Sequence, residues 1–124
     1  MSALRTSGSP EVFDESAAAD AAASLFRGMS DASRVAILRH LLLGEHNVGE
    51  LTAHLGLAQS TVSKHLACLR DCGLVESRPV GRASVFSLTR PDGVLKVFAA
   101  AEDLLAATGD AVVLCPNYGE GVGR

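Results

Sequence analysis

The chain has 124 residues, 3 cysteines and a formal net charge of −3, with a sequence pI near 5.7. This length fits one domain with a modest core, and no apolar run approaches the roughly 18 residues that a membrane span needs. The first residues lack the cationic and apolar segments of a signal peptide, so we expect a cytoplasmic protein with no membrane partner. An acidic total does not indicate nucleic-acid binding, although the distribution of charge matters more than its sum.

The N-terminal half of the chain predicts a flexible segment followed by two helices. Residues 1–15 contain Ser, Gly and Pro without periodicity, which is typical of a flexible N-terminal segment. A run of strong helix formers then begins at Ser16, which is the expected cap of a first helix. In 30–44, apolar residues recur at helical spacing between Asp31, a candidate cap, and Gly44, a candidate stop, so a second helix is expected.

The middle of the chain predicts a helix-turn-helix. The segment 48–56 and the segment 60–73 each have helical periodicity, and each closes on a glycine. The turn between them is tight, and the second helix carries hydroxyls, a lysine and a histidine on its polar face. Two short helices so joined, with polar groups on the second, are typical of a helix-turn-helix.

The rest of the chain predicts a hairpin and a last helix. Residues 74–79 and 83–89 alternate in polarity and contain β-branched and aromatic residues, so they are expected to pair as a wing. A final helix over 90–109 begins with a proline near its first turn. We therefore predict a mainly α winged helix-turn-helix domain with a small β-hairpin wing over 16–108, and a C-terminal tail over 109–124 that carries a candidate metal ligand.

The predicted recognition helix supplies groups that could contact DNA. Between residues 59 and 82, four basic residues stand against two acidic ones, a thin basic patch. The same residue types are also common on an ordinary solvated helix face, but the complete order of elements favours DNA binding. No set of nucleophile, base and orienting group indicates an enzyme. The candidate DNA contacts are Gln59, Ser60, Thr61, Ser63, Lys64, His65, Arg78 and Arg82.

Three phrases carry a specific resemblance to a known family: "SDASRVAILRHL", "LTAHLGLAQSTVSKHLACLRDCGLV" and "GRASVFSL". Together they resemble the ArsR/SmtB family of metal-sensing repressors, over about Leu25 to Leu105. The resemblance implies a homodimer held by the first and last helices. It also implies that this dimer binds double-stranded operator DNA at an imperfect palindrome, represses transcription, and leaves the DNA when an inducer binds.

The resemblance also implies where inducers bind, and two common family sites lack their ligands here. The stretch "HNVGEL", which matches a Cys-x-Cys site, has no cysteine, and all 4 histidines precede the last helix, where another site would need them. We expect His40 and His54 to be surface or helix-packing residues. Cys68, Cys72 and Cys115 resemble the three-thiolate site of cadmium- and lead-sensing members of the family, in which the tail cysteine comes from the partner subunit.

Soft thiolate donors favour Cd(II) or Pb(II) as the inducer, with Zn(II) or As(III) also possible. Cys68 and Cys72 are four apart and therefore share one helix face, and Arg70 and His65 nearby are expected to favour the thiolate. Two alternatives remain open at this point. The cysteines could be small buried core residues, or a redox or arsenite sensor could use the same scaffold.

Overall fold

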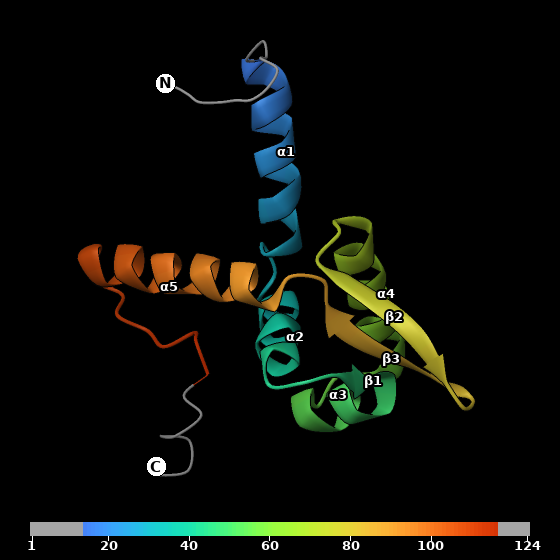
Figure 1. Cartoon of the computed structure of the whole chain (residues 1–124). Coiled ribbons are helices and arrows are strands. Elements are labelled where there is room, and N and C mark those ends of the chain that lie inside the picture. The colour runs from blue at the N-terminus through green and yellow to red at the C-terminus, as the bar shows by residue number, and fades with distance from the viewer. Residues whose placement is uncertain (1–13, 117–124) are drawn as a thin grey trace.

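The computed structural model describes residues 14–116, and these form five helices and three strands (Figure 1). The elements are α1 (Glu15–Gly28), α2 (Ala32–Leu42), β1 (His46–Asn47), α3 (Val48–Leu55), α4 (Gln59–Asp71), β2 (Val75–Val80), β3 (Ala83–Leu88) and α5 (Pro91–Ala107). The predicted winged helix-turn-helix order is confirmed. Most of the predicted N-terminal segment and the end of the predicted tail lie outside the described residues. No helix within 14–116 has the length and apolar character that crossing a membrane requires.

Side-chain caps and glycines determine where most helices begin and end. The Asp31 carboxylate accepts hydrogen bonds from two backbone N–H groups at the start of α2, as predicted. Asp14 caps α1, so the expectation that Ser16 would do so is wrong; the helix begins one residue earlier, and Ser16 lies inside it. Gly56 and Gly73 have φ angles of 67° and 79°, a left-handed conformation that ends α3 and α4 at low steric cost.

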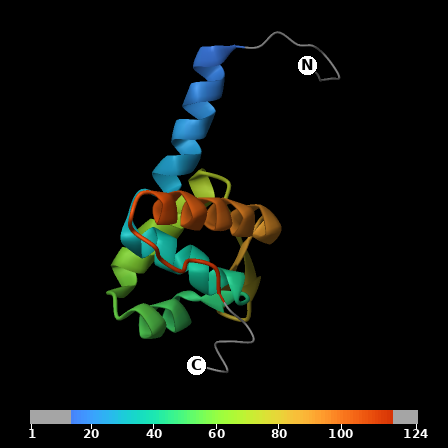
Figure 2. The same cartoon turned by 90° about the vertical axis from the view of Figure 1, so that its left-hand side faces the viewer.

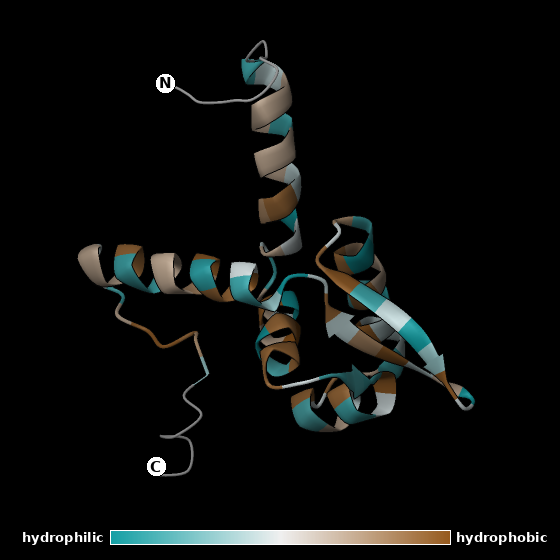
Figure 3. Ribbon diagram, viewed as in Figure 1, coloured by the Kyte–Doolittle hydropathy of each residue, from teal (hydrophilic) through white to brown (hydrophobic). Residues whose placement is uncertain are grey.

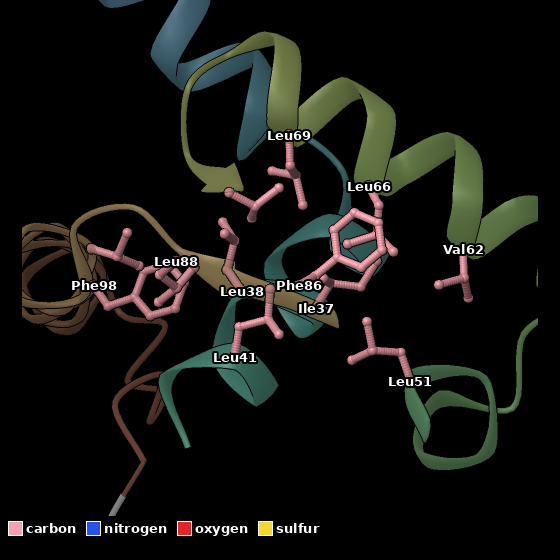
Figure 4. Close-up of a cluster of buried hydrophobic side chains, with 12 residues drawn as sticks. Ile37, Leu38, Leu41, Leu51, Val62, Leu66, Leu69, Phe86, Leu88 and Phe98 are labelled. Carbon is pink, nitrogen blue, oxygen red and sulfur yellow. The ribbon is translucent and has the colours of Figure 1, made fainter. Parts of the chain in front are cut away.

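The core lies where α2 meets the helix-turn-helix, β3 and the start of α5 (Figure 4). The apolar side of α4, which the helical periodicity of 60–73 predicted, faces this core. Each leucine buried there contributes about 1.5–3 kcal/mol of stability relative to an exposed leucine. The packing fixes α4 against α2 on one side and leaves the opposite side of α4 free. The buried residues are Ile37, Leu38, Leu41, Leu51, Val62, Leu66, Leu69, Val75, Phe86, Leu88, Val94 and Phe98.

The wing belongs to a three-stranded antiparallel sheet in the order β1-β3-β2. The predicted hairpin is confirmed: β2 and β3 pair from Val75 opposite Leu88 to Val80 opposite Ala83. The sequence did not reveal β1, because two residues are too few to show an alternating pattern. This short strand pairs with β3 directly before α3 and thereby ties the helix-turn-helix to the wing.

Helix α1 stands away from the body of the molecule, and α5 extends along a second direction (Figures 1 and 2). Residues 15–23 are all exposed, and only Gly28 of α1 is buried. Apolar residues nevertheless occur on the exposed turns of both helices (Figure 3). Phe26 and Leu104 are 58% and 67% exposed, and they line one apolar groove between the two helices. An isolated helix of this length is marginal in water, so this face has the character of a surface that another chain covers.

Candidate DNA-binding surface and cysteine site

The N-terminal half of α4 presents an exposed polar row. Gln59, Ser60, Ser63 and Lys64 are exposed, and Thr61 is half-buried. Among residues 14–116 no side chain caps the start of α4, which leaves its first backbone N–H groups available at the positive end of the helix dipole. Free N–H groups beside hydroxyls and an ammonium are suited to phosphate contacts.

A hollow next to this row brings the recognition helix and the wing together. It is bordered by the start of α3, by Gln59 on α4, and by Arg82 in the turn between β2 and β3. Arg82 is exposed and has no hydrogen-bond or ion-pair partner within 14–116. Two of the predicted DNA contacts, from segments well separated in the sequence, therefore lie at one surface.

The remaining two predicted DNA contacts, Arg78 and His65, bind other side chains of the same chain. The Arg78 Nη2 donates to both carboxylate oxygens of Glu45, at 2.8 and 2.6 Å, although both side chains are about half exposed. The His65 side chain is 17% exposed and lies toward α2, with Nε2 3.7 Å from Asp31 and Nδ1 3.4 Å from Arg34. These contacts favour an intramolecular role for His65, and its assignment as a DNA contact stays a prediction.

The two upstream cysteines are paired at the end of α4 that lies farthest from the exposed row. Cys72 caps α4, and the Cys72 thiol donates to the Ser24 carbonyl of α1 at 3.5 Å. Cys68 lies beside the Cys72 thiol, close enough to raise its pKa. Gly28 allows this approach, since a Cβ there would lie 3.1 Å from Leu74 and 3.4 Å from the Cys72 sulfur. The thiol pair therefore bridges the recognition helix and the helix that projects from the body.

The surroundings of Cys72 shift the pKa of its thiol in the direction opposite to the one predicted from the sequence. Burial raises the pKa of the Cys72 thiol, and the neighbouring Cys68 raises that pKa further. Arg27 and Arg34, rather than the predicted Arg70 and His65, lower it, and they do not outweigh burial. The expectation of a favoured thiolate is therefore wrong for Cys72: without a metal it stays a thiol at neutral pH, and a metal must displace its proton.

Cys115 lies on a different part of the chain surface. The Arg39 Nε donates to the Leu114 carbonyl at 2.9 Å, and Glu102 accepts from the backbone N–H groups of Leu114 and Cys115 at 2.5 and 2.7 Å. These bonds hold the start of the tail across α2 and α5, as Figure 2 shows for the red segment after α5. Within 14–116 the three thiols of one chain do not come within ligand distance of a common point.

Glu102 controls the Cys115 thiol as well as the tail. Burial raises the pKa of Cys115, and the Glu102 carboxylate raises that pKa further. Glu102→Gln removes the negative charge, so the pKa of Cys115 should fall and the thiol should react roughly severalfold faster with iodoacetamide at pH 8. Mass spectrometry of the alkylated peptides measures this rate separately for each cysteine. Asp103→Asn, an equal charge change on the exposed neighbour, should leave it unchanged; equal acceleration in both variants would contradict the role of Glu102.

Sequence reasoning missed one group of side chains. The rings of His40, His46 and His54, from α2, β1 and α3, lie side by side, with centroids 5.1–6.2 Å apart. Their spacing along the chain matches no single-helix or hairpin ligand pattern, and only the packing of three elements brings them together. The expectation that His40 and His54 are unrelated surface or packing residues did not anticipate this group.

The fold and the exposed half of α4 define a winged helix-turn-helix DNA-binding protein. Residues 31–77 match the model of the family described as "Bacterial regulatory protein, arsR family". Over 104 residues the chain is 36% identical to a probable mercury resistance operon repressor of Streptomyces lividans, with 82% of each chain covered. The chain belongs to the arsR family of bacterial transcription regulators. The predicted family and the prediction of a regulator rather than an enzyme are confirmed.

Two further comparisons concern the cysteine site and the assembly of subunits. The chain is 48% identical over 68 residues to the regulator CmtR of Mycobacterium tuberculosis. These aligned residues make up 55% of this chain and 58% of CmtR. It superposes with a TM-score of 0.64, at 27% identity, on a homodimeric winged helix-turn-helix DNA-binding domain of Mycobacterium bovis, described as a possible ArsR-family regulator. That likeness covers 74% of this chain and 89% of the other.

Proposed function

We propose that the chain is a homodimeric repressor that binds operator DNA when metal-free and leaves it when a thiophilic ion binds Cys68, Cys72 and Cys115. Cd(II) and Pb(II) are the first candidates, and Zn(II) and As(III) are further ones. The observation that carries the proposal is the thiol pair at the end of the recognition helix, in contact with Ser24 of α1. A relative that covers most of the chain is named a mercury resistance repressor, so Hg(II) is also worth testing.

The exposed apolar face of α1 and α5 supports the homodimer. Its groove is lined by apolar side chains, and two of its large residues, Phe26 and Leu104, are more than half exposed in the single chain. A two-fold pairing of this face with itself would cover α1, which makes few contacts within its own chain. The Mycobacterium bovis neighbour is described as homodimeric, which agrees with this arrangement.

The same pairing would bring the third thiol to the other two. Cys72 contacts α1, and α1 would be covered by α5 of the partner subunit, from whose end the tail with Cys115 follows. In one chain Cys115 is instead bound along its own α2 and α5. We therefore place the tail ligand of each site on the partner subunit, so that each ion would join two subunits.

Release of DNA would follow from this geometry. Cys72 would give up its hydrogen bond to Ser24 on binding a metal, and the C-terminal end of α4 would shift relative to α1. The other half of α4 carries the DNA contacts, and the spacing of two half-sites depends on the angle between the two recognition helices. A coupling of about 1–3 kcal/mol, typical of allosteric proteins, corresponds to about 5–150-fold weaker DNA binding.

Anaerobic titration of the reduced protein with Pb(II) tests the site. Near-ultraviolet sulfur-to-lead absorption should saturate at one ion per subunit. The band should weaken or shift in Cys115→Ser, which removes one of three sulfurs. An unchanged band in that variant would exclude the tail from the site. The absence of a band in wild type would indicate that Cys68 and Cys72 are packing residues rather than metal ligands.

A redox sensor on the same scaffold is the second candidate, because all three cysteines are free thiols and two of them are in contact. The raised pKa of Cys72 argues against it, since the thiolate is the form that oxidants attack. Peroxide added to metal-free protein on operator DNA separates the two candidates. Release by peroxide but not by metal would favour the redox sensor.

Arg82 should contribute to DNA affinity through phosphate charge. Arg82→Ala should weaken binding and lower the slope of log affinity against log salt by about 0.9 for each phosphate that the protein no longer neutralises. Fluorescence anisotropy at several salt concentrations measures both quantities. Lys96→Ala removes an exposed charge on α5, away from the hollow, and should change neither. Equal salt slopes for wild type and Arg82→Ala would show that the turn of the wing does not contact DNA phosphates.

A further inference from the structure

Three histidines meet at the junction of α2, β1 and α3, and no cysteine belongs to their group. His40 lies in the last turn of α2, His46 is the first residue of β1, and His54 lies near the end of α3. Each offers one nitrogen, and the three nitrogens lie within 4.8 Å of one another. No other group of three potential ligands so close together exists within 14–116.

The geometry is near that of a bound metal ion. Zn–N bonds are about 2.0–2.1 Å, so nitrogens in a tetrahedral site lie about 3.4 Å apart. Rotation of the rings about their side-chain bonds has to shorten any one separation by at most about 1.4 Å. His40 and His46 are half-buried, whereas His54 is exposed and free to move. Modest rotations of the three rings, the largest of them at the exposed His54, would close the site.

The surroundings prepare the rings as ligands. The His46 Nδ1 lies 2.8 Å from the Gly44 carbonyl, which can only accept, so Nδ1 carries the proton and Nε2 keeps its lone pair. Metal-binding histidines almost always donate the second ring N–H to a carboxylate, a backbone carbonyl or a water, and Gly44 supplies such a carbonyl here.

We propose that His40, His46 and His54 form a second metal site, within one subunit, for a borderline divalent cation such as Zn(II), Co(II) or Ni(II). Imidazole nitrogen suits these ions, whereas Cd(II) and Pb(II) suit the thiolates and Mg(II) and Ca(II) require oxygen. The exposed side of His54 leaves a fourth position for water or another small ligand, so the site is open.

An ion bound by the three histidines would link α2 to α3 of the helix-turn-helix and, through β1, to the wing. His46 pairs with Phe86 of β3, the inner strand of the wing, and His54 belongs to the first helix of the helix-turn-helix. The adjacent Glu45 holds Arg78 on β2. Occupancy would therefore fix α3 and the base of the wing relative to α2, which is a different task from joining two subunits.

The test uses protein in which all three cysteines are replaced by serine, so that failure of the thiolate site cannot affect it. Co(II) should bind at one ion per subunit and give visible d–d bands without sulfur charge transfer. His54→Gln in this background should weaken binding at least about 10–100-fold, the loss seen when even a supporting partner is removed. His65→Gln, the fourth histidine, should bind Co(II) as the parent does.

Nitrogen-15 spectra of the histidine rings give an independent readout. Addition of Zn(II) should shift the ring signals of His40, His46 and His54 and leave those of His65 in place. Should the cysteine-free protein not fold, as judged by circular dichroism, the comparison moves to wild type, where His54→Gln should lose one Zn(II) equivalent per subunit. Absent d–d bands in folded protein, undiminished binding by His54→Gln, or a lack of shift at the three rings would overturn the proposal.

Discussion

Cys68→Ser should leave metal-free DNA binding unchanged and abolish its release by Pb(II). Wild-type protein should lose about 5–150-fold in DNA affinity when the metal saturates. The variant should lose none, because two sulfurs remain of three and serine is a poor ligand for a soft ion. Serine is close to cysteine in size and Cys72 itself makes the bond to Ser24, so α4 and its contact with α1 should persist.

Anisotropy titrations of operator DNA, with and without Pb(II), measure both properties in one experiment. Ala67→Ser provides the matched control, since it places a hydroxyl on the neighbouring residue of α4 and removes no thiol. This control should release DNA as wild type does. Continued release from Cys68→Ser would locate the inducer site elsewhere, and weakened metal-free binding would show that Cys68 supports the recognition helix itself.

The fold was largely predictable because its determinants are local. Asp31 at a helix start, Gly56 and Gly73 at helix ends, and the alternating strands around Gly81 each act within a few residues. The two misses have different physical causes, one long-range and one local. Strand β1 exists only through its pairing with β3, and the choice of Asp14 over Ser16 depends on which carboxylate or hydroxyl reaches the free N–H groups.

The candidate sites were less predictable because they depend on contacts between distant segments. The cysteine pair was visible as a four-residue spacing, but its burial against Ser24 was not, and that burial reverses the expected direction of the Cys72 pKa. The histidine group had no local signature, since its members come from three elements. Arg78 and His65 looked like free polar groups in the sequence, whereas Glu45 and Asp31 engage them in the fold.

Leu104→Asp should convert the proposed homodimer to a monomer. Leu104 is 67% exposed in one chain and lines the apolar groove between α1 and α5. A two-fold interface contains each residue twice, so the lost burial amounts to about 3–6 kcal/mol per dimer. That loss corresponds to a dimer dissociation constant on the order of 10²–10⁴-fold larger. Analytical ultracentrifugation across a concentration series measures the change.

The control is Leu43→Asp, the same substitution at another exposed leucine, 54% accessible, at the end of α2 and outside the groove. It should stay dimeric. Because a palindromic operator needs two recognition helices at fixed spacing, monomeric Leu104→Asp should bind DNA weakly and with no preference for paired half-sites. Since each proposed thiolate site needs the tail of the partner subunit, the Pb(II) absorption should also weaken. A Leu104→Asp protein that remained dimeric would move the interface away from α1 and α5, and with it the route by which Cys115 reaches the other two thiols.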